Sequence, residues 1–177
     1  TLSLDDLVKK ADSSYEFEDP DENDPALLCF TTGTTGAPKG VMYTHRGVFL
    51  RALATGLADT YSLSEKDTVL NVVPMYHISS WFIPYAAALF GSSQVFPGPH
   101  PTPKTILELV LSEKVTVSDG VPTVWLDVLN YAKSLNIDRL GSLRRIIVGG
   151  SAVPEALIRT YGELGVEVIH AWGMTET

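Results

Sequence analysis

Residues 31–40 have the composition of a phosphate-binding loop. They read TTGTTGAPKG, with four threonines, three glycines and one lysine directly after an apolar run. Glycine amides and threonine hydroxyls can converge on phosphate oxygens, and Lys39 adds positive charge. A P-loop, GxxxxGK followed by Ser or Thr, is excluded because Pro38 stands five residues after Gly33 and a glycine follows Lys39. The alternative is an ordinary Gly/Thr-rich turn, and the length of the run favours polyphosphate binding.

The same ten residues resemble the phosphate-loop signature of the adenylate-forming superfamily, which contains acyl-CoA synthetases, luciferases and peptide-synthetase adenylation domains. In that family the loop holds the β and γ phosphates of ATP. The chemistry needs such donors, because an anionic carboxylate must approach the α phosphorus while pyrophosphate leaves. The resemblance assigns this role to Thr31, Thr32, Gly33, Thr34, Thr35, Gly36 and Lys39.

A second motif, HAWGMTET at residues 170–177, follows a short apolar run. It is similar to the family's YGxTE motif, with Trp172 in the place of the usual tyrosine. The resemblance implies that Trp172 and Gly173 lie along the adenine, that Thr175 meets the α phosphate and that Glu176 is a Mg²⁺ ligand. One carboxylate is sufficient, because Mg²⁺ keeps waters and phosphate oxygens as its other ligands. Outside the motif, Glu176 would be interpreted as a surface charge.

Residues 145–154 read RIIVGGSAVP, an apolar run that ends in paired glycines. The resemblance implies that Gly149, Gly150 and Ser151 let the main chain approach adenine. A serine-hydrolase elbow of the GxSxG type is excluded, because Val153 occupies the position of the final glycine.

A third motif, PMYHISSW at residues 74–81, contains His77. In the family a histidine at this position lies beside the acyl carboxylate and the α phosphate, so we count His77 with Lys39, Thr175 and Glu176 as candidate catalytic residues. A histidine alone is more often a structural hydrogen-bonding group. The other three histidines, His45, His100 and His170, have no comparable support for a catalytic role.

The sequence of residues 26–177 is similar to the sequences of medium- and long-chain fatty-acyl-CoA synthetases. This favours an apolar acyl tunnel, with Trp81, Val121 and Pro122 as pocket residues, over an amino-acid pocket, which would place an aspartate near Trp81. The predicted enzyme uses ATP, Mg²⁺ and coenzyme A to convert a fatty acid to acyl-AMP and then acyl-CoA. An aromatic or other acid, another thiol acceptor and an inactive nucleotide-binding module stay open as alternatives.

The elements that position these motifs alternate along the chain. Apolar runs without polar alternation, separated by segments of helical period, predict an α/β fold with a doubly wound, mostly parallel sheet flanked by helices. Ligands of such sheets bind at the carboxyl ends of strands, where the motifs lie. Strands are predicted at residues 26–31, 68–73, 94–96, 115–118, 145–148 and 166–170, and helices at 1–11, 46–61, 81–90, from 103, at 122–134 and from 154.

Composition restricts the class of protein. Residues 1–25 read as a helix and an acidic linker, and residues 26–177 as the nucleotide- and acyl-binding region. With 45% hydrophobic and 19% charged residues the chain is typical of a folded protein, and a net charge of −8 argues against nucleic-acid binding. One cysteine excludes an internal disulfide and fits the cytoplasm. No apolar run reaches the roughly 18 residues that a membrane helix needs.

The chain lacks an initiator methionine and ends after a glycine-containing turn, which we interpret as a fragment of a larger N-terminal domain. The family completes its site with a ribose-binding aspartate and with a lysine on a mobile C-terminal domain, and neither region is in this sequence. We therefore expect the isolated chain to turn over little substrate. A homodimer is an open possibility for the parent protein.

Overall fold

The computed structural model describes residues 3–31 and 36–176. Among these, no helix has the length and apolar character that crossing a bilayer requires. The elements, in chain order, are α1 (Leu4–Lys10), β1 (Pro25–Thr31), β2 (Lys39–Thr44), α2 (His45–Gly56), β3 (Thr68–Leu70), α3 (Ile78–Phe90), β4 (Ser93–Val95), α4 (Pro103–Ser112), β5 (Val117–Gly120), α5 (Pro122–Ser134), β6 (Arg145–Val148), α6 (Glu155–Glu163) and β7 (Glu167–His170).

Five strands form a parallel sheet in the order β4-β3-β5-β6-β7. From β3 the chain moves to the edge strand β4, returns to the other side of β3 as β5, and then continues through β6 to β7. The order therefore reverses between β3 and β5. Loops from these two strands separate there, and such a switch point is where open α/β sheets bind ligands.

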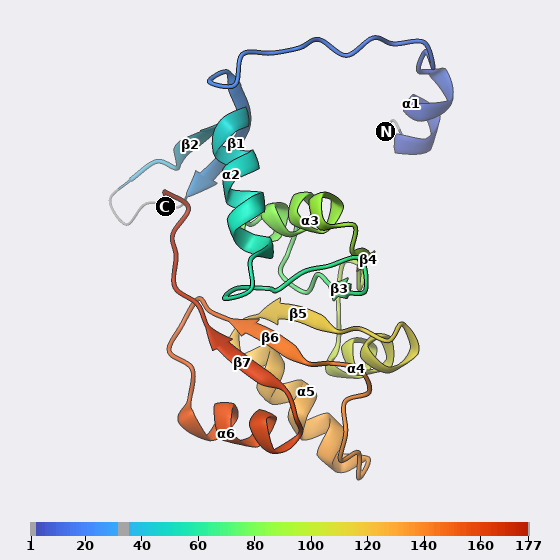
Figure 1. Cartoon of the computed structure of the whole chain (residues 1–177), viewed down its shortest axis with the longest axis vertical. Helices are drawn as coiled ribbons and strands as arrows, with labels where there is room; N and C mark the ends of the chain where they lie inside the picture. The colour runs from blue at the N-terminus through green and yellow to red at the C-terminus, as the bar shows by residue number, and fades with distance from the viewer. Residues whose placement is uncertain (1–2, 32–35, 177) are drawn as a thin grey trace.

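Helices cover both faces of the sheet, which confirms the predicted doubly wound fold (Figure 1). On β6, Ile147 packs with α2 and α3, whereas the neighbouring Ile146 and Val148 pack with α4, α5 and α6. The same alternation separates Val69 from Leu70 on β3. A strand that is buried on both faces has no solvent-exposed face for polar residues, which explains the continuous apolar runs in the sequence.

Helix boundaries agree best with the prediction where capping signals are present. Thr102 caps α4 by accepting a hydrogen bond from the amide of Thr105 at 3.1 Å, and Pro103 is the first helical residue, as predicted. Helix α5 has the predicted bounds. Helix α2 ends at Gly56 instead of residue 61, because the segment that follows folds back and places Tyr61 against the sheet.

The structure corrects the prediction for residues 39–45. We expected a loop there, but β2 pairs with β1 in an antiparallel hairpin outside the five-stranded sheet. The outer face of the hairpin is exposed, and the inner face packs on α2 and α3 through a small cluster around Val48, Ile78 and Phe82. Figure 1 shows the hairpin at one end of the sheet, with α1 apart from the other elements. Helix α1 buries no residue.

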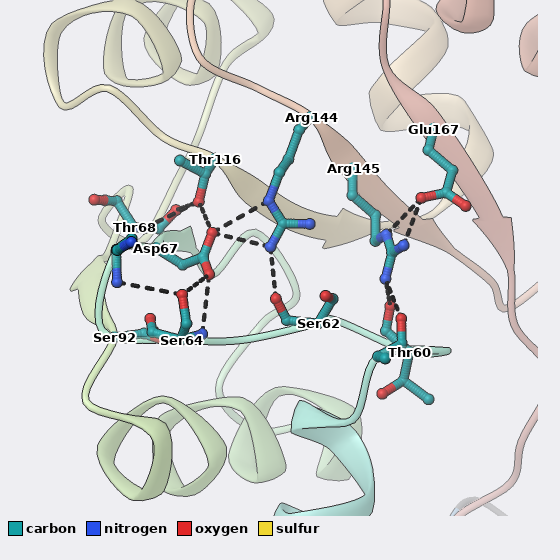
Figure 2. A network of polar contacts seen from close by, with 12 residues as sticks. Thr60, Ser62, Ser64, Asp67, Thr68, Ser92, Thr116, Arg144, Arg145 and Glu167 are labelled. Atoms are coloured by element: carbon teal, nitrogen blue, oxygen red, sulfur yellow. Dashed lines mark hydrogen bonds and ion pairs between the residues drawn. The ribbon is translucent and has the colours of Figure 1, made fainter.

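A polar network holds the amino ends of the central strands (Figure 2). Asp67 accepts hydrogen bonds from the Ser64 amide and hydroxyl and from the Thr116 hydroxyl, and pairs with Arg144 at 2.9 Å. Burial alone would raise the pKa of Asp67, but these bonds and the Arg144 charge together lower it. The next residue, Arg145, pairs with Glu167 at the start of β7 at 2.6 Å. The network ties β3, β5, β6 and β7 together at the edge opposite the predicted site.

Candidate functional site

Four predicted segments follow neighbouring strands of the parallel sheet. The segment with His77 follows β3, Val121 follows β5, the turn at residues 149–151 follows β6, and residues 171–176 follow β7. Parallel strands end at the same edge, so the structure brings these segments to one side of the sheet.

The glycine turn after β6 packs main chain against its neighbours on both sides. A Cβ atom on Gly149 would lie 2.7 Å from the carbonyl oxygen of Ala171, and one on Gly150 would lie 3.3 Å from Cγ1 of Val121. Gly150 also has φ of +82°, which side chains rarely adopt. The Gly149 amide donates to the Gly120 carbonyl at 3.2 Å. Glycine at both positions is therefore needed for the segments after β5, β6 and β7 to lie in contact.

The C-terminal segment runs from β7 to the β1–β2 hairpin (Figure 1). There the hydroxyl of Tyr43, on β2, donates a hydrogen bond to the carbonyl oxygen of Thr175. Burial raises the pKa of Tyr43, and the neighbouring Cys29 and Glu176 raise it further, while Arg51 opposes them. These interactions place Glu176 close to the hairpin that ends in the predicted phosphate loop.

The centre of that loop, Thr32, Gly33, Thr34 and Thr35, lies outside the described residues. The residues that flank it close the hairpin: Thr31, at the end of β1, pairs with Lys39 at the start of β2. The Lys39 side chain is exposed. Gly36 has φ of +150°, and a Cβ there would meet nothing within 4 Å. The described ends of the loop therefore carry an exposed cation, Lys39, beside a glycine.

His77 lies in the turn that enters α3, with an exposed side chain. Its amide donates to the carbonyl of Pro74 at 2.9 Å, and its carbonyl accepts from the Ser80 amide at 3.0 Å. The buried Ser80 hydroxyl donates to the Val73 carbonyl at 2.8 Å. The His77 main chain is therefore held by its own turn and by the first turn of the helix.

The predicted adenine and acyl residues differ in burial. Trp172 is 79% exposed, Val121 is 41% exposed at the start of α5, and Pro122 is buried. Gly173 and Ser151 are exposed and Thr175 is half-buried. Trp81 lies on α3, and its side chain is outside the described part of the chain. An open stacking surface at Trp172 and a partly open apolar wall at Val121 thus stand at the same edge.

A hollow lined by described residues lies elsewhere. It has a volume of about 490 Å³ and is apolar, between β1, α2 and α3. Neither Val121 nor Pro122 is among its lining residues, which are Ala26, Leu27, His45, Val48, Phe49, Ala52, Tyr85, Ala88 and Leu89. The hollow is therefore separate from the predicted pocket residues Val121 and Pro122.

Sequence reasoning missed Asp119, the one carboxylate inside the carboxyl edge of the described sheet. It is 3% exposed, accepts a hydrogen bond from the Val72 amide at 3.3 Å, and faces the Tyr61 hydroxyl at 3.5 Å. Burial raises the pKa of Asp119 to about 7, against the opposing bonds from Val72, Val73 and Tyr61. An aspartate directly after the predicted strand at residues 115–118 was the available signal.

The metal prediction depends on Glu176 alone. Within residues 3–31 and 36–176, no group of three or more His, Cys, Asp or Glu side chains could hold a metal ion. An exposed carboxylate fits Mg²⁺ if substrate phosphates and waters supply the remaining oxygens, which is the usual arrangement for this cation. The donor set therefore fits a nucleotide-bound cation.

Together, the doubly wound sheet, its switch point and the Gly/Thr-rich hairpin define a nucleotide-binding class of α/β protein. The family model described as AMP-binding enzyme matches residues 2–177, and the chain belongs to this family of adenylate-forming enzymes. The resemblance stated from the sequence is thereby confirmed.

Two curated relatives are similar over most of the chain. A medium-chain-fatty-acid–CoA ligase of Ectopseudomonas oleovorans is 46% identical over 176 residues, which are 99% of this chain and 32% of the relative. A long-chain-fatty-acid–CoA ligase of Thermus thermophilus is 52% identical over 150 residues, 85% of this chain and 28% of the relative. The chain thus spans about a third of the length of these relatives.

Solved structures agree on the fold. The inhibitor-bound N-terminal domain of FACL13 from Mycobacterium tuberculosis has a TM-score of 0.85 at 27% identity, covering 98% of this chain and 43% of that one. The o-succinylbenzoate CoA synthetase of Bacillus subtilis in complex with ATP and Mg²⁺ has a TM-score of 0.84 at 28% identity, covering 99% of this chain and 36% of that one. The predicted relation to N-terminal domains of adenylate-forming enzymes is confirmed.

Proposed function

We propose that the intact protein is an ATP-dependent, AMP-forming fatty-acid–CoA ligase. One observation carries the proposal: the hairpin that ends in the Gly/Thr-rich loop contacts the C-terminal segment through Tyr43 and Thr175, beside Glu176. The hairpin that carries the predicted phosphate loop is therefore in contact with the segment that carries the predicted Mg²⁺ ligand, which supports one shared nucleotide site. The relatives named as medium- and long-chain-fatty-acid–CoA ligases support a fatty acid as the substrate and coenzyme A as the acceptor.

The loop at residues 31–36 and Lys39 would bind the β and γ phosphates of ATP. Glu176 would hold Mg²⁺ together with phosphate oxygens, and Thr175 would contact the α phosphate. The bound cation would offset the negative charge of the triphosphate. Binding at these positions would hold pyrophosphate as the leaving group while the carboxylate approaches the α phosphorus.

The adenine would lie between the turn at residues 149–151 and the segment with Trp172 and Gly173. The contact between Gly149 and the Ala171 carbonyl makes these two segments immediate neighbours. His77 would orient the fatty-acid carboxylate, and Trp81, Val121 and Pro122 would contribute to the acyl pocket.

Two displacements then complete the reaction. A carboxylate oxygen forms a bond to the α phosphorus, and the bond to pyrophosphate breaks. In the second step the thiolate sulfur of coenzyme A attacks the acyl carbon, and AMP leaves with the bonding electron pair. The protein accelerates both steps by alignment and by donors placed where negative charge gathers.

The test is acid-dependent pyrophosphate–ATP exchange by the intact protein with a panel of fatty, aromatic and amino acids. We expect fatty acids to give the highest rates, and Lys39→Ala and Glu176→Gln each to lower kcat/KM for ATP by about 100-fold, since each removes charge complementary to the triphosphate or its cation. Lys104→Ala and Glu163→Gln are matched controls on exposed helix positions and should change it less than about twofold. A preference for amino or aromatic acids would reject the assignment to fatty acids.

We further propose a cytoplasmic enzyme with small-molecule substrates and no nucleic-acid partner. The single cysteine and the net charge of −8 support these assignments. Its assembly as a homodimer is tested by sedimentation of the intact protein. We also expect the isolated chain to show little exchange activity, which the same assay measures.

A further inference from the structure

Asp119 is a buried carboxyl group that the proposed reaction does not use. It stands at the carboxyl end of β5, next to the switch point between β3 and β5, and the residues after it, Gly120 and Val121, begin the predicted acyl wall. Carboxylates are rarely buried without several hydrogen bonds, because desolvation disfavours the charge. The groups that donate hydrogen bonds to Asp119 therefore indicate its role in the structure.

Its main partners are amides of the segment that leads to His77. Oδ1 of Asp119 accepts from the Val72 amide at 3.3 Å, and the Val73 amide is a second hydrogen-bond donor to the carboxyl group. The Asn71 amide still donates to the Val95 carbonyl of β4 at 3.0 Å, whereas Val72 and Val73 lie beyond the pairing of β3 with β4 and β5. Asp119 thus supplies the acceptor that the sheet no longer provides.

The other side of the segment is anchored independently. The Ser80 hydroxyl donates to the Val73 carbonyl at 2.8 Å, and the His77 amide closes the turn on Pro74. Val73 is therefore held through its amide by β5 and through its carbonyl by α3. The turn with His77 begins at the next residue, so its position depends on this double anchor.

Resting on the proposed function, we propose that Asp119 is a positioning residue for acyl activation: its carboxyl group accepts the Val72 and Val73 amides and so sets the place of the His77 turn opposite the wall at Val121. Tyr61 holds the second carboxyl oxygen from the α2–α3 face of the sheet. Asp119 touches neither substrate nor cofactor in this role. It acts through the main chain of the turn.

The experiment compares three variants of the intact protein. Asp119→Leu removes the acceptor and retains an apolar side chain of similar size, whereas Asp119→Asn keeps an amide oxygen in the same place. Ser118→Ala is the matched control, because Ser118 is fully buried on the same strand and its hydroxyl bonds to Leu70 within the sheet at 2.7 Å. Measurements are acid-dependent pyrophosphate exchange, KM for ATP, and hydrogen exchange of the Val72 and Val73 amides.

We expect Asp119→Leu to lower kcat about 10- to 100-fold with KM for ATP changed less than about threefold, because misplacing a group beside the reacting atoms impairs chemistry more than nucleotide binding. Exchange at the Val72 and Val73 amides should accelerate at least about tenfold. Asp119→Asn should restore kcat to within about threefold, and Ser118→Ala should affect neither readout.

Unchanged amide exchange in Asp119→Leu would overturn the proposal, as would an equal loss of kcat in Ser118→Ala. Failure of Asp119→Asn to recover more activity than Asp119→Leu would also overturn it. If the wild-type protein catalyses no acid-dependent exchange, the proposed function fails. The amide-exchange comparison between Asp119→Leu and Ser118→Ala then still decides whether Asp119 anchors the loop.

Discussion

The two edges of the parallel sheet are built on opposite principles. At the amino edge, Asp67 and Arg144 bond to each other and to neighbouring strands and loops, so the charged groups there serve mainly each other (Figure 2). At the carboxyl edge, Trp172 and Glu176 are exposed and the glycine turn leaves the main chain accessible. We interpret the difference as a separation of stability from the proposed binding: one edge joins the strands, and the other leaves its groups exposed.

Asp119 is the exception at the carboxyl edge, because it is buried like a residue of the amino edge. Its environment nevertheless differs from that of Asp67. Asp67 has a guanidinium partner and a lowered pKa, whereas Asp119 accepts from the neutral donors Val72, Val73 and Tyr61 and has a pKa raised to about 7. Three predictions use this contrast, in order of decreasing effect on stability.

The largest effect is expected at the amino edge. Asp67→Ala removes the acceptor of Ser64 and Thr116 and leaves Arg144 without its partner, so the free energy of unfolding should fall by about 2–3 kcal/mol. We place the value below that of a fully buried pair because Arg144 is 38% exposed. Chemical denaturation of the intact protein measures it.

The control for Asp67→Ala is Glu176→Ala, which removes an exposed carboxylate at the other edge. Its free energy of unfolding should change by less than about 0.5 kcal/mol while exchange activity is lost. Equal destabilisation by the two substitutions would contradict the interpretation that the amino edge stabilises the fold and the carboxyl edge does not.

The second prediction concerns the pH dependence of stability. The folded-state pKa of Asp119 is about 7, above its ordinary value of 3.8, so the folded protein retains a proton that the unfolded chain releases. Raising the pH from about 4 to 7 should therefore remove stability. Tyr61 stays neutral in this window, because burial and Asp119 raise its pKa well above 10.

Asp119→Asn abolishes this titration. The variant should have a higher melting temperature than the wild-type protein at pH 8, and the difference should vanish near pH 4. Asp67→Asn is the opposite case: the lowered pKa of Asp67 contributes stability above pH 4 that is lost as the pH falls. Identical pH profiles for the two variants would show that their environments do not differ as the structure indicates.

The smallest effect is expected at the hairpin. Tyr43→Phe removes the hydroxyl that donates to the Thr175 carbonyl, which should cost about 1 kcal/mol or less of stability. Because this contact joins the phosphate-loop hairpin to the segment with Glu176, we expect the Kd for ATP to rise about three- to tenfold, measured by calorimetry. Tyr15→Phe, at a 64% exposed position of the acidic linker, should change neither quantity. If Tyr43→Phe binds ATP as tightly as the wild-type protein, the contact between the hairpin and the segment with Glu176 does not contribute to ATP binding.

Much of the scaffold could be predicted from local patterns. Residues 145–148 form the predicted strand and residues 122–134 the predicted helix, and Thr102 caps α4 as expected. Strand β2 was missed because its sequence, KGVMYT, follows a Gly/Pro-rich loop. Polar and apolar residues alternate along only part of it. Its extended state comes from pairing with β1 across that loop. Ranges such as 68–73 were predicted too long because the strand ends where its neighbours stop pairing.

By itself, the sequence determined the chemistry of each segment: hydroxyls, glycines and a lysine beside an apolar strand, and a carboxylate after Trp172, because these depend on residues next to one another. Only the tertiary structure decided which segments meet. Tyr43 reaches Thr175 across 132 residues, and Asp119 binds the Val72 amide across 47. Strand order places these groups together, and the burial that it creates raises the pKa of Asp119, so neither property exists in the unfolded chain.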